Sequence, residues 1–208
     1  MKHLFFFPLF LLAYCLAVAQ NDFIGIAKYK ITVEGSSNPI TDSMSVIFSR
    51  QKVKVILYLP ALTDSGSVSE KIFIDDFGIK KSIALDTESK TYKTDTLNSS
   101  AKYDFSNTQK VAASSNNLLC FLYTADSTKI DRSGILTVDC LASIDYRNSL
   151  ISNYSFLGIQ PIIIDNRIVM DFIITQTDGI KQRIYIFDIK RMEDVEPYFN
   201  LNGYKQVN

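Results

Sequence analysis

Residues 167–190 have the sequence RIVMDFIITQTDGIKQRIYIFDIK, and this stretch decides the fold. Its two halves are rich in Ile, Val, Phe and Tyr, residue types that are typical of β-strands. Asp178 and Gly179 lie between the halves, and this dipeptide favours a two-residue type I′ turn, in which both positions need φ > 0. The stretch therefore predicts a β-hairpin with its turn at these two residues.

The turn determines which side chains of the hairpin share a face. With a two-residue loop, Phe172 pairs with Tyr185 and Met170 pairs with Phe187. We therefore expect these four side chains to line the principal core or a ligand cavity. The same face also carries Ile168, Ile174 and Ile189, and the opposite face carries Val169, Ile173, Ile184 and Ile186, with Asp171 and Asp188 among them. A sheet that is apolar on both faces must be covered on both, by protein or by a bound molecule.

The rest of the chain also shows strand patterns separated by short turns. Residues 23–34 alternate apolar and polar side chains, as a half-buried strand of an antiparallel sheet does. The pattern indicates a mostly β fold: a single curved antiparallel sheet forming a half-barrel or barrel, with few short helical turns. Further strands are predicted at 43–50, 52–59, 71–75, 81–86, 91–95 and within 118–146. Residues 97–117 are predicted to be a loop with room for one strand near Tyr103, and residues 147–166 are predicted to be irregular. A helical turn is predicted at 192–198, before a short terminal strand.

Residues 1–19 are predicted to be a signal peptide, because a short positive start precedes an apolar run over 4–16 and an A-x-A site that ends at Ala19. The apolar run is too short for a membrane span, and no later segment approaches the ~20 apolar residues that a span needs. A lipid anchor on Cys15 is the alternative, but Tyr14 is large where a lipoprotein signal has a small residue. We therefore expect cleavage after Ala19, export, and a single domain over residues 20–208.

Composition argues against several classes of function. The chain has 22 basic and 22 acidic residues, so we expect no clustered basic surface of the kind that binds nucleic acid. Its one histidine is His3, inside the predicted signal peptide, so the mature chain lacks histidine. This excludes Ser-His-Asp and Cys-His catalysis and His-ligated zinc. We predict a protein that is not an enzyme and has no cofactor or metal site, although a carboxylate-only mechanism stays open.

Several polar residues have both a functional and a structural interpretation. Asp75 and Asp76 are interpreted as a solvated turn before Gly78, because the spaced oxygen donors of a calcium loop are absent. Asp171 and Asp188 could act as a buried acid or base, but pairing with a nearby Lys or Arg, or a place at the sheet edge, is favoured. Tyrosines that could line a binding site, but are favoured as core residues, are Tyr123, Tyr146, Tyr154 and Tyr185.

Cys120 and Cys140 are predicted to form a disulfide. The strand-like stretches on either side of residues 126–133 form a hairpin centred near Ile130, in which the two cysteines lie directly opposite each other. In this register one face is apolar throughout, whereas a one-residue slip would bring Asp139 onto that face. Opposed Cβ atoms in antiparallel strands are close enough for a bridge, and an exported location permits it. The alternative is two free, buried thiols that pack as small hydrophobic groups.

Motifs spaced along the chain follow a recognisable pattern. The opening F-x-G-x-x-x-Y-K-x-T-V-E-G starts at Phe23, the strand pair LDTESKTY covers 85–92, Cys120 lies mid-chain, and the ending F-x-L-x-G-Y-K covers 199–205. Together they resemble secreted bacterial domains of unknown function, and residues 153–163 (NYSFLGIQPII) are similar to a loop of the related GLPGLI family. The resemblance implies a half-barrel like that of the LolA-like lipoprotein carriers, whose curved sheet holds acyl chains in its concave face. It assigns no residue a role.

Three functions are consistent with these features. The first is an exported binding protein for an apolar ligand, such as a lipid or acyl chain, in the periplasm or on the extracellular face of a Gram-negative bacterium. It is favoured by the doubly apolar hairpin, the absence of histidine and the export signal. The second is an envelope module that binds another protein through a sheet edge or an apolar face. A carboxylate-only enzyme is third, and no pair of carboxylates in the sequence singles itself out.

Overall fold

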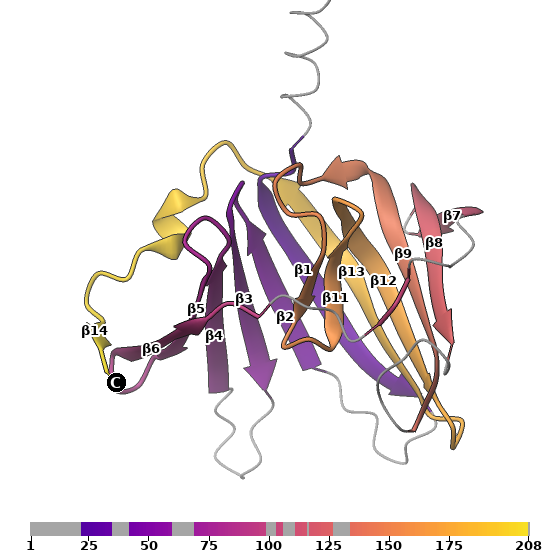
Figure 1. The fold of residues 1–208 in the computed structure, drawn as a ribbon, viewed down its shortest axis with the longest axis horizontal. Helices are drawn as coiled ribbons and strands as arrows, with labels where there is room; N and C mark the ends of the chain where they lie inside the picture. The colour runs from indigo at the N-terminus through magenta and orange to yellow at the C-terminus, as the bar shows by residue number, and fades with distance from the viewer. Residues whose placement is uncertain are drawn as a thin grey trace, which may run out of the picture.

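The computed structural model describes residues 22–34, 42–59, 69–98, 103–105, 111–115, 117–126 and 134–207. The predicted signal peptide at 1–19 lies outside these residues. The described part forms one large, curved and open β-sheet, which confirms the predicted mostly β half-barrel (Figure 1). Besides strands it contains a 3-10 helix, η2 (Glu196–Phe199), and within these ranges no helix is long and apolar enough to cross a membrane.

Fourteen strands make up the sheet in the described ranges. They are β1 (Gly25–Glu34), β2 (Asp42–Phe48), β3 (Lys52–Leu59), β4 (Ser69–Asp76), β5 (Lys81–Asp86), β6 (Thr91–Thr96), β7 (Val111–Ser115), β8 (Leu118–Asp126), β9 (Ile135–Arg147), β10 (Tyr154–Phe156), β11 (Gln160–Ile164), β12 (Arg167–Gln176), β13 (Lys181–Arg191) and β14 (Lys205–Gln206). Their order in space is β14-β6-β5-β4-β3-β2-β1-β13-β12-β9-β8-β7, with the β10–β11 hairpin branching from β12. The strand pairs are antiparallel except β14 with β6.

The β12–β13 hairpin joins the two halves of the sheet. β13 pairs with β1 along its length, from Arg191 opposite Gly25 to Lys181 opposite Glu34. β12 pairs with β9 on its other side. The N-terminal strands β1 to β6 therefore lie on one side of the hairpin, and β7 to β9 lie on the other (Figure 1). The stretch 167–190 is the centre of the sheet, as the sequence suggested.

The main hydrophobic core lies on the concave face, where the β10–β11 hairpin folds across the sheet (Figure 1). Alternate residues of the long strands point to this side, as the two-residue period of a strand requires. β10 and β11 are buried at every position, so the hairpin is part of the core itself. The core includes Ala27, Tyr29, Met44, Val46, Phe48, Val53, Val55, Tyr123, Val138, Cys140, Ile162, Ile168, Met170, Phe172, Ile184 and Ile186.

A second, smaller core lies on the opposite face of β2 to β5. The C-terminal segment after β13 crosses this face and brings Val195 and Phe199 onto Ile47, Ile72 and Ile74. Two lysines of β3 hold the segment in place: the Nζ of Lys52 lies 3.0 Å from Glu196, and the Nζ of Lys54 donates to the Tyr198 carbonyl at 2.7 Å. Helix η2 and strand β14 confirm the predicted helical turn and terminal strand.

The predicted register of the β12–β13 hairpin is wrong by one residue. Phe172 pairs with Ile184 and not with Tyr185. The N–H of Gly179 donates to the carbonyl three residues earlier, and Gly179 has φ +87° whereas Asp178 is not in the positive-φ region. This is a three-residue loop made of a type I turn and a glycine bulge. The extra loop residue shifts every pair by one.

The shift separates the four side chains that were predicted to share a face. Met170 and Phe172 are buried in the main core on the concave face. Tyr185 is half-buried on the other face. The register between β1 and β13 skips Phe187, which is a β-bulge residue and is 57% exposed. The prediction is therefore wrong for Tyr185 and Phe187.

The predicted disulfide between Cys120 and Cys140 is also wrong, since both thiols are free and buried. Cys120 lies opposite Ser143, three residues from its predicted partner, and this odd shift places the two thiols on opposite faces. In the observed register Asp139 lies opposite Thr124, whose hydroxyl donates a hydrogen bond to its carboxylate at 2.7 Å. The position of Asp139 therefore does not disfavour the observed register. The structure therefore has the alternative arrangement, two packed thiols.

Both thiols are expected to resist alkylation in the folded protein and to react once it unfolds. Burial raises the pKa of the Cys140 thiol well above its usual value and raises the pKa of Cys120, so little thiolate forms near neutral pH. For a chain that begins at Gln20, intact mass after iodoacetamide should show no adduct in native buffer and two adducts in guanidinium without reductant. A chain that stays unlabelled in guanidinium until reductant is added would contain the bridge after all.

Candidate functional site

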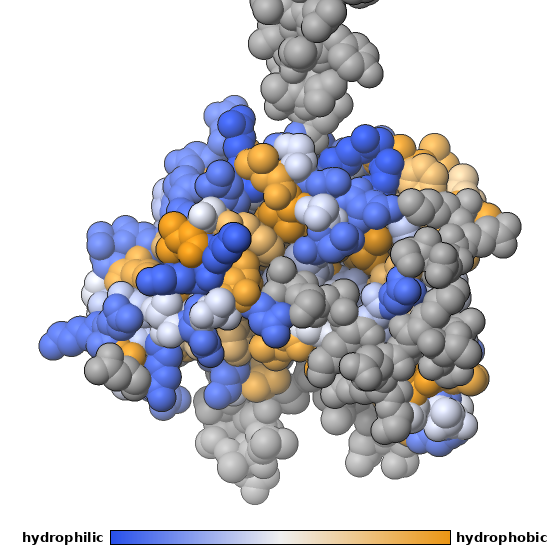
Figure 2. Space-filling view, in the orientation of Figure 1, coloured by the Kyte–Doolittle hydropathy of each residue, from blue (hydrophilic) through white to orange (hydrophobic). Residues whose placement is uncertain are grey.

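An apolar pocket lies on the concave face, between the sheet and the turn of the β10–β11 hairpin. Its volume is about 240 Å³. Figure 2 shows hydrophobic side chains gathered along the middle of this side of the molecule. None of the described residues that line the pocket is charged. They are Ile31, Ser43, Leu57, Tyr58, Leu59, Phe156, Leu157, Ile159, Gln160, Phe172, Ile174, Gln182 and Ile184.

The floor of the pocket follows from the register of the central strands. Ile184 of β13 lies opposite Phe172 of β12 on one side and opposite Ile31 of β1 on the other. These three apolar side chains form a row across the sheet, because directly opposed residues point to the same face. In the next row toward the hairpin turn, Ile174 lies opposite Gln182, which supplies an amide at the floor.

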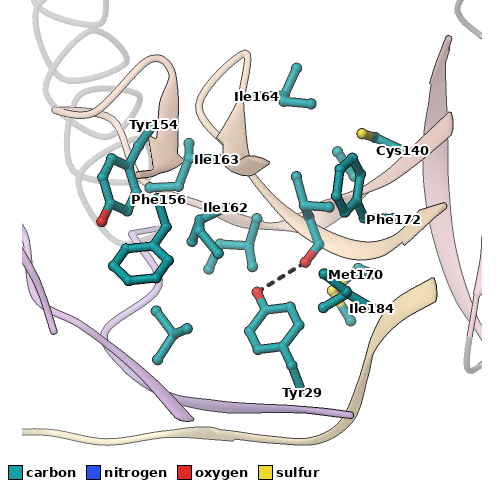
Figure 3. Close-up of a cluster of buried hydrophobic side chains, with 14 of the residues drawn as sticks. Tyr29, Cys140, Tyr154, Phe156, Ile162, Ile163, Ile164, Met170, Phe172 and Ile184 are labelled. Carbon is teal, nitrogen blue, oxygen red and sulfur yellow. Dashed lines mark hydrogen bonds between the residues drawn. The ribbon is translucent and has the colours of Figure 1, made fainter. Parts of the chain in front are cut away.

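The roof of the pocket is the end of the β10–β11 hairpin. Phe156 packs edge-to-face on Phe73 of β4, with ring centroids 5.2 Å apart. Figure 3 shows Phe156 and Ile162 directed from the hairpin toward the sheet, where Tyr29 lies. Leu157 and the glycine after it have φ of +52° and +68°, the signature of a type I′ turn. The hairpin therefore places Leu157 at the mouth of the pocket.

A buried hydrogen-bond network ties the start of the hairpin to the sheet. The Tyr154 hydroxyl donates to one oxygen of Asp75 at 2.5 Å, and the Ser82 hydroxyl donates to the other at 2.5 Å. Burial and the Asp75 charge raise the pKa of Tyr154 well above its usual value, so the phenol stays a donor. The interpretation of the aspartate pair as a solvated turn is wrong for Asp75, which is buried. It is right for Asp76, whose carboxylate accepts from the Gly78 N–H.

A second hydroxyl bond reaches across the floor. β12 is irregular against β9 on either side of Val169. The Tyr29 hydroxyl of β1 donates to the Val169 carbonyl at 3.0 Å, as the dashed line in Figure 3 marks. Burial raises the pKa of Tyr29 far above its usual value, which keeps this donor protonated. The bond satisfies a buried carbonyl beside the irregularity.

The two aspartates of the central hairpin are paired with cations on the outer face. Asp171 is buried, and its carboxylate accepts hydrogen bonds from the Nε of Arg183 at 3.1 Å and from the Nη2 of Arg183 at 2.5 Å. The guanidinium stacks on the ring of Tyr185 at 4.9 Å, and its hydrogen bond to Asp171 raises its own pKa. Asp188 lies 3.2 Å from Lys28. The favoured interpretation, pairing with a nearby Lys or Arg, is confirmed.

The site brings together only part of what the sequence singled out. Phe172 lines the pocket, and Met170 belongs to the same core cluster as Phe172. Tyr185 and Phe187 do not line the pocket. Tyr123 and Tyr154 are core residues, as favoured, and no predicted tyrosine lines the pocket. Sequence reasoning missed the β1 and β3 side of the floor. The hairpin roof was flagged only through the family resemblance of residues 153–163, which contain β10 and most of β11.

Metal-ligand clusters are not found in the described ranges: no three His, Cys, Asp or Glu side chains there are placed to hold an ion. Comparison with known proteins adds no assignment, because no protein-family model matches the chain and no curated protein matches it significantly. The resemblance to the GLPGLI family therefore stays a prediction.

Several solved structures share the general course of the chain. One is the structure of PNGF-II, with 9% identity and a TM-score of 0.48 over 88% of this chain, which spans only 30% of that protein. A LolA superfamily protein from Nitrosomonas europaea has 9% identity and a TM-score of 0.40, with 87% and 91% of the two chains covered. A putative outer membrane lipoprotein-sorting protein domain from Vibrio parahaemolyticus has 12% identity and a TM-score of 0.33, with 92% and 96% covered. At these scores the similarities carry no argument about function.

Proposed function

We propose that this protein binds the hydrocarbon part of a lipid or a similar acyl-chain ligand in the pocket beneath the β10–β11 hairpin. The observation that carries the proposal is the lining: apolar side chains from four strands and the hairpin enclose a space that no charged side chain of the described residues enters. Concave apolar sites with a few polar groups are the usual form of a small-molecule site. The amides of Gln160 and Gln182 supply those polar groups.

The size of the pocket limits what it can enclose. At about 240 Å³ it is larger than the ~150 Å³ cavity that accepts benzene, and somewhat smaller than the ~300 Å³ of ordinary ligand sites. It suits one hydrocarbon chain and not a whole lipid, so a charged head group would stay in water. The predicted signal peptide supports a location of this activity in the cell envelope. A concave pocket supports a ligand over a protein partner, which a flat apolar patch would favour.

The test is binding of cis-parinarate, an unbranched fatty acid whose fluorophore is a conjugated tetraene within the chain, to the purified protein. The wild type should enhance the tetraene emission in a saturable way. Ile31→Trp should weaken binding at least about ten-fold, because the indole fills the pocket from a position that is already partly open.

The matched control for this variant is Ile173→Trp. Ile173 is also half-buried, but it lies between two pocket residues of β12 and points to the other face of the sheet. The affinity of the Ile173→Trp variant for the fatty acid should therefore stay close to that of the wild type. Absence of saturable binding by the wild type, or equal affinities of the two variants, would reject the proposal.

A further inference from the structure

Leu157 stands out among the residues with a left-handed backbone. The non-glycine residues with φ > 0 in the described ranges are Lys80, Lys90, Asn117, Leu157, Asp165 and Asn166. Asn and Asp tolerate this conformation, whereas a side chain such as leucine is disfavoured by the clash of its Cβ with the following carbonyl oxygen. A type I′ turn is normally built from Asn, Asp or Gly. Leu157 is the one apolar residue in the set.

Nothing within the described part of the protein compensates this cost by burial. The Leu157 side chain is 62% exposed, so it gains little from the hydrophobic effect. A residue that is both strained and exposed points to a function outside the fold itself. The position of Leu157 indicates that this function is ligand binding, because Leu157 lines the pocket together with Phe156 and Gln160.

We propose that Leu157 contacts the ligand where it leaves the pocket and thereby sets the affinity for chain length; this inference rests on the proposed function. A single unbranched alkyl chain that enters tail first fills the 240 Å³ and then passes the mouth. Methylenes beyond the filled pocket are covered by the Leu157 side chain and lose contact with water. Each methylene so covered raises affinity by up to about four-fold. Short chains end inside the pocket and never reach Leu157.

The variant that tests this is Leu157→Asn, measured by competition of octanoate, decanoate, dodecanoate and tetradecanoate against cis-parinarate. Asparagine fits the left-handed turn, so the melting temperature should rise by about 2–4 °C. Affinity for octanoate should stay unchanged, whereas affinity for dodecanoate and tetradecanoate should fall about ten-fold. A more stable protein with a selective loss for long chains is a combination that a purely structural role of Leu157 does not produce.

Two further variants complete the design. Leu157→Met keeps an apolar side chain in the strained position, so it should retain long-chain binding without gaining stability. Leu150→Asn removes another exposed leucine, 56% exposed and outside the pocket, and should leave both the melting temperature and the chain-length series unchanged.

The outcomes separate the two proposals. If the wild type binds fatty acids and the affinity of Leu157→Asn changes with chain length as that of the wild type does, the role assigned to Leu157 is overturned. The proposed function of the pocket is then unaffected. A Leu157→Asn protein that is no more stable than the wild type overturns the strain on which the assignment rests. If the wild type binds no fatty acid of the series, the proposed function fails and the assignment fails with it.

Discussion

Replacing Phe172 with alanine is expected to lower the free energy of unfolding by about 3–5 kcal/mol, the range for a buried phenylalanine. The ring is 1% exposed and lies at the centre of the sheet, opposite Ile184 and Cys140 on its two neighbouring strands. It also contacts Tyr103, with ring centroids 6.2 Å apart. Urea unfolding followed by circular dichroism measures the change.

The matched control is Phe187→Ala. Phe187 was predicted to share a face with Phe172, but it is exposed, and its removal should cost less than about 1 kcal/mol. The pair of variants therefore tests the observed register as well as the core. Equal costs for the two phenylalanines would restore the predicted register. A small cost at Phe172 together with lost fatty-acid binding would instead mean that the ring contributes to ligand binding and little to the stability of the core.

Replacing Gly25 with alanine is expected to cost about 3 kcal/mol or more and to lower the melting temperature by about 6–12 °C. A Cβ added to Gly25 would clash with the backbone carbonyl oxygen of Lys190 on β13. The clash has no easy release, because Gly25 pairs with Arg191 on one side and Phe48 on the other. Thermal melting by circular dichroism measures the shift.

The comparison variant for Gly25 is Gly179→Ala in the β12–β13 turn. An added Cβ there meets nothing within 4 Å, so its cost comes only from the left-handed backbone at φ +87° and should be about 1–2 kcal/mol. A cost at Gly25 no larger than that at Gly179 would show that β1 and β13 can move apart to accept a side chain.

The central hairpin shows how far local sequence determines register. Asp178-Gly179 correctly located the turn, because both candidate loops place the glycine in a left-handed conformation. The two loops differ in whether Asp178 also has φ > 0, and aspartate tolerates either state. The face of each β13 residue before Phe187 depends on which of the two loops forms. The bulge at Phe187 then changes the alternation again, and it is set by pairing with β1, far away in the sequence.

The pocket was harder to predict because its parts are distant in sequence and lack a strand period. β10 and β11 are buried at every position, so they show none of the alternation that reveals a half-buried strand. Their turn is built from Leu157 and Gly158, which is not a usual turn pair. Asp75 was interpreted as a turn residue because it stands beside Asp76 before Gly78, and its hydrogen-bond partner Tyr154 lies 79 positions further along the chain. Half-buried strands such as β1, by contrast, were predictable from their alternation.

The position of β1 beside β13 also has a consequence for the order in which the protein can form. Gly25 and Arg191 are paired in the sheet but stand at opposite ends of the described chain. β1 can pair early with β2, its neighbour in the sequence, whereas its other edge stays open until β13 reaches it. Sheets dominated by such distant pairings fold slowly, in milliseconds to seconds. An unpaired strand edge is a surface on which chains can associate with one another, so β1 is exposed to association until β13 pairs with it.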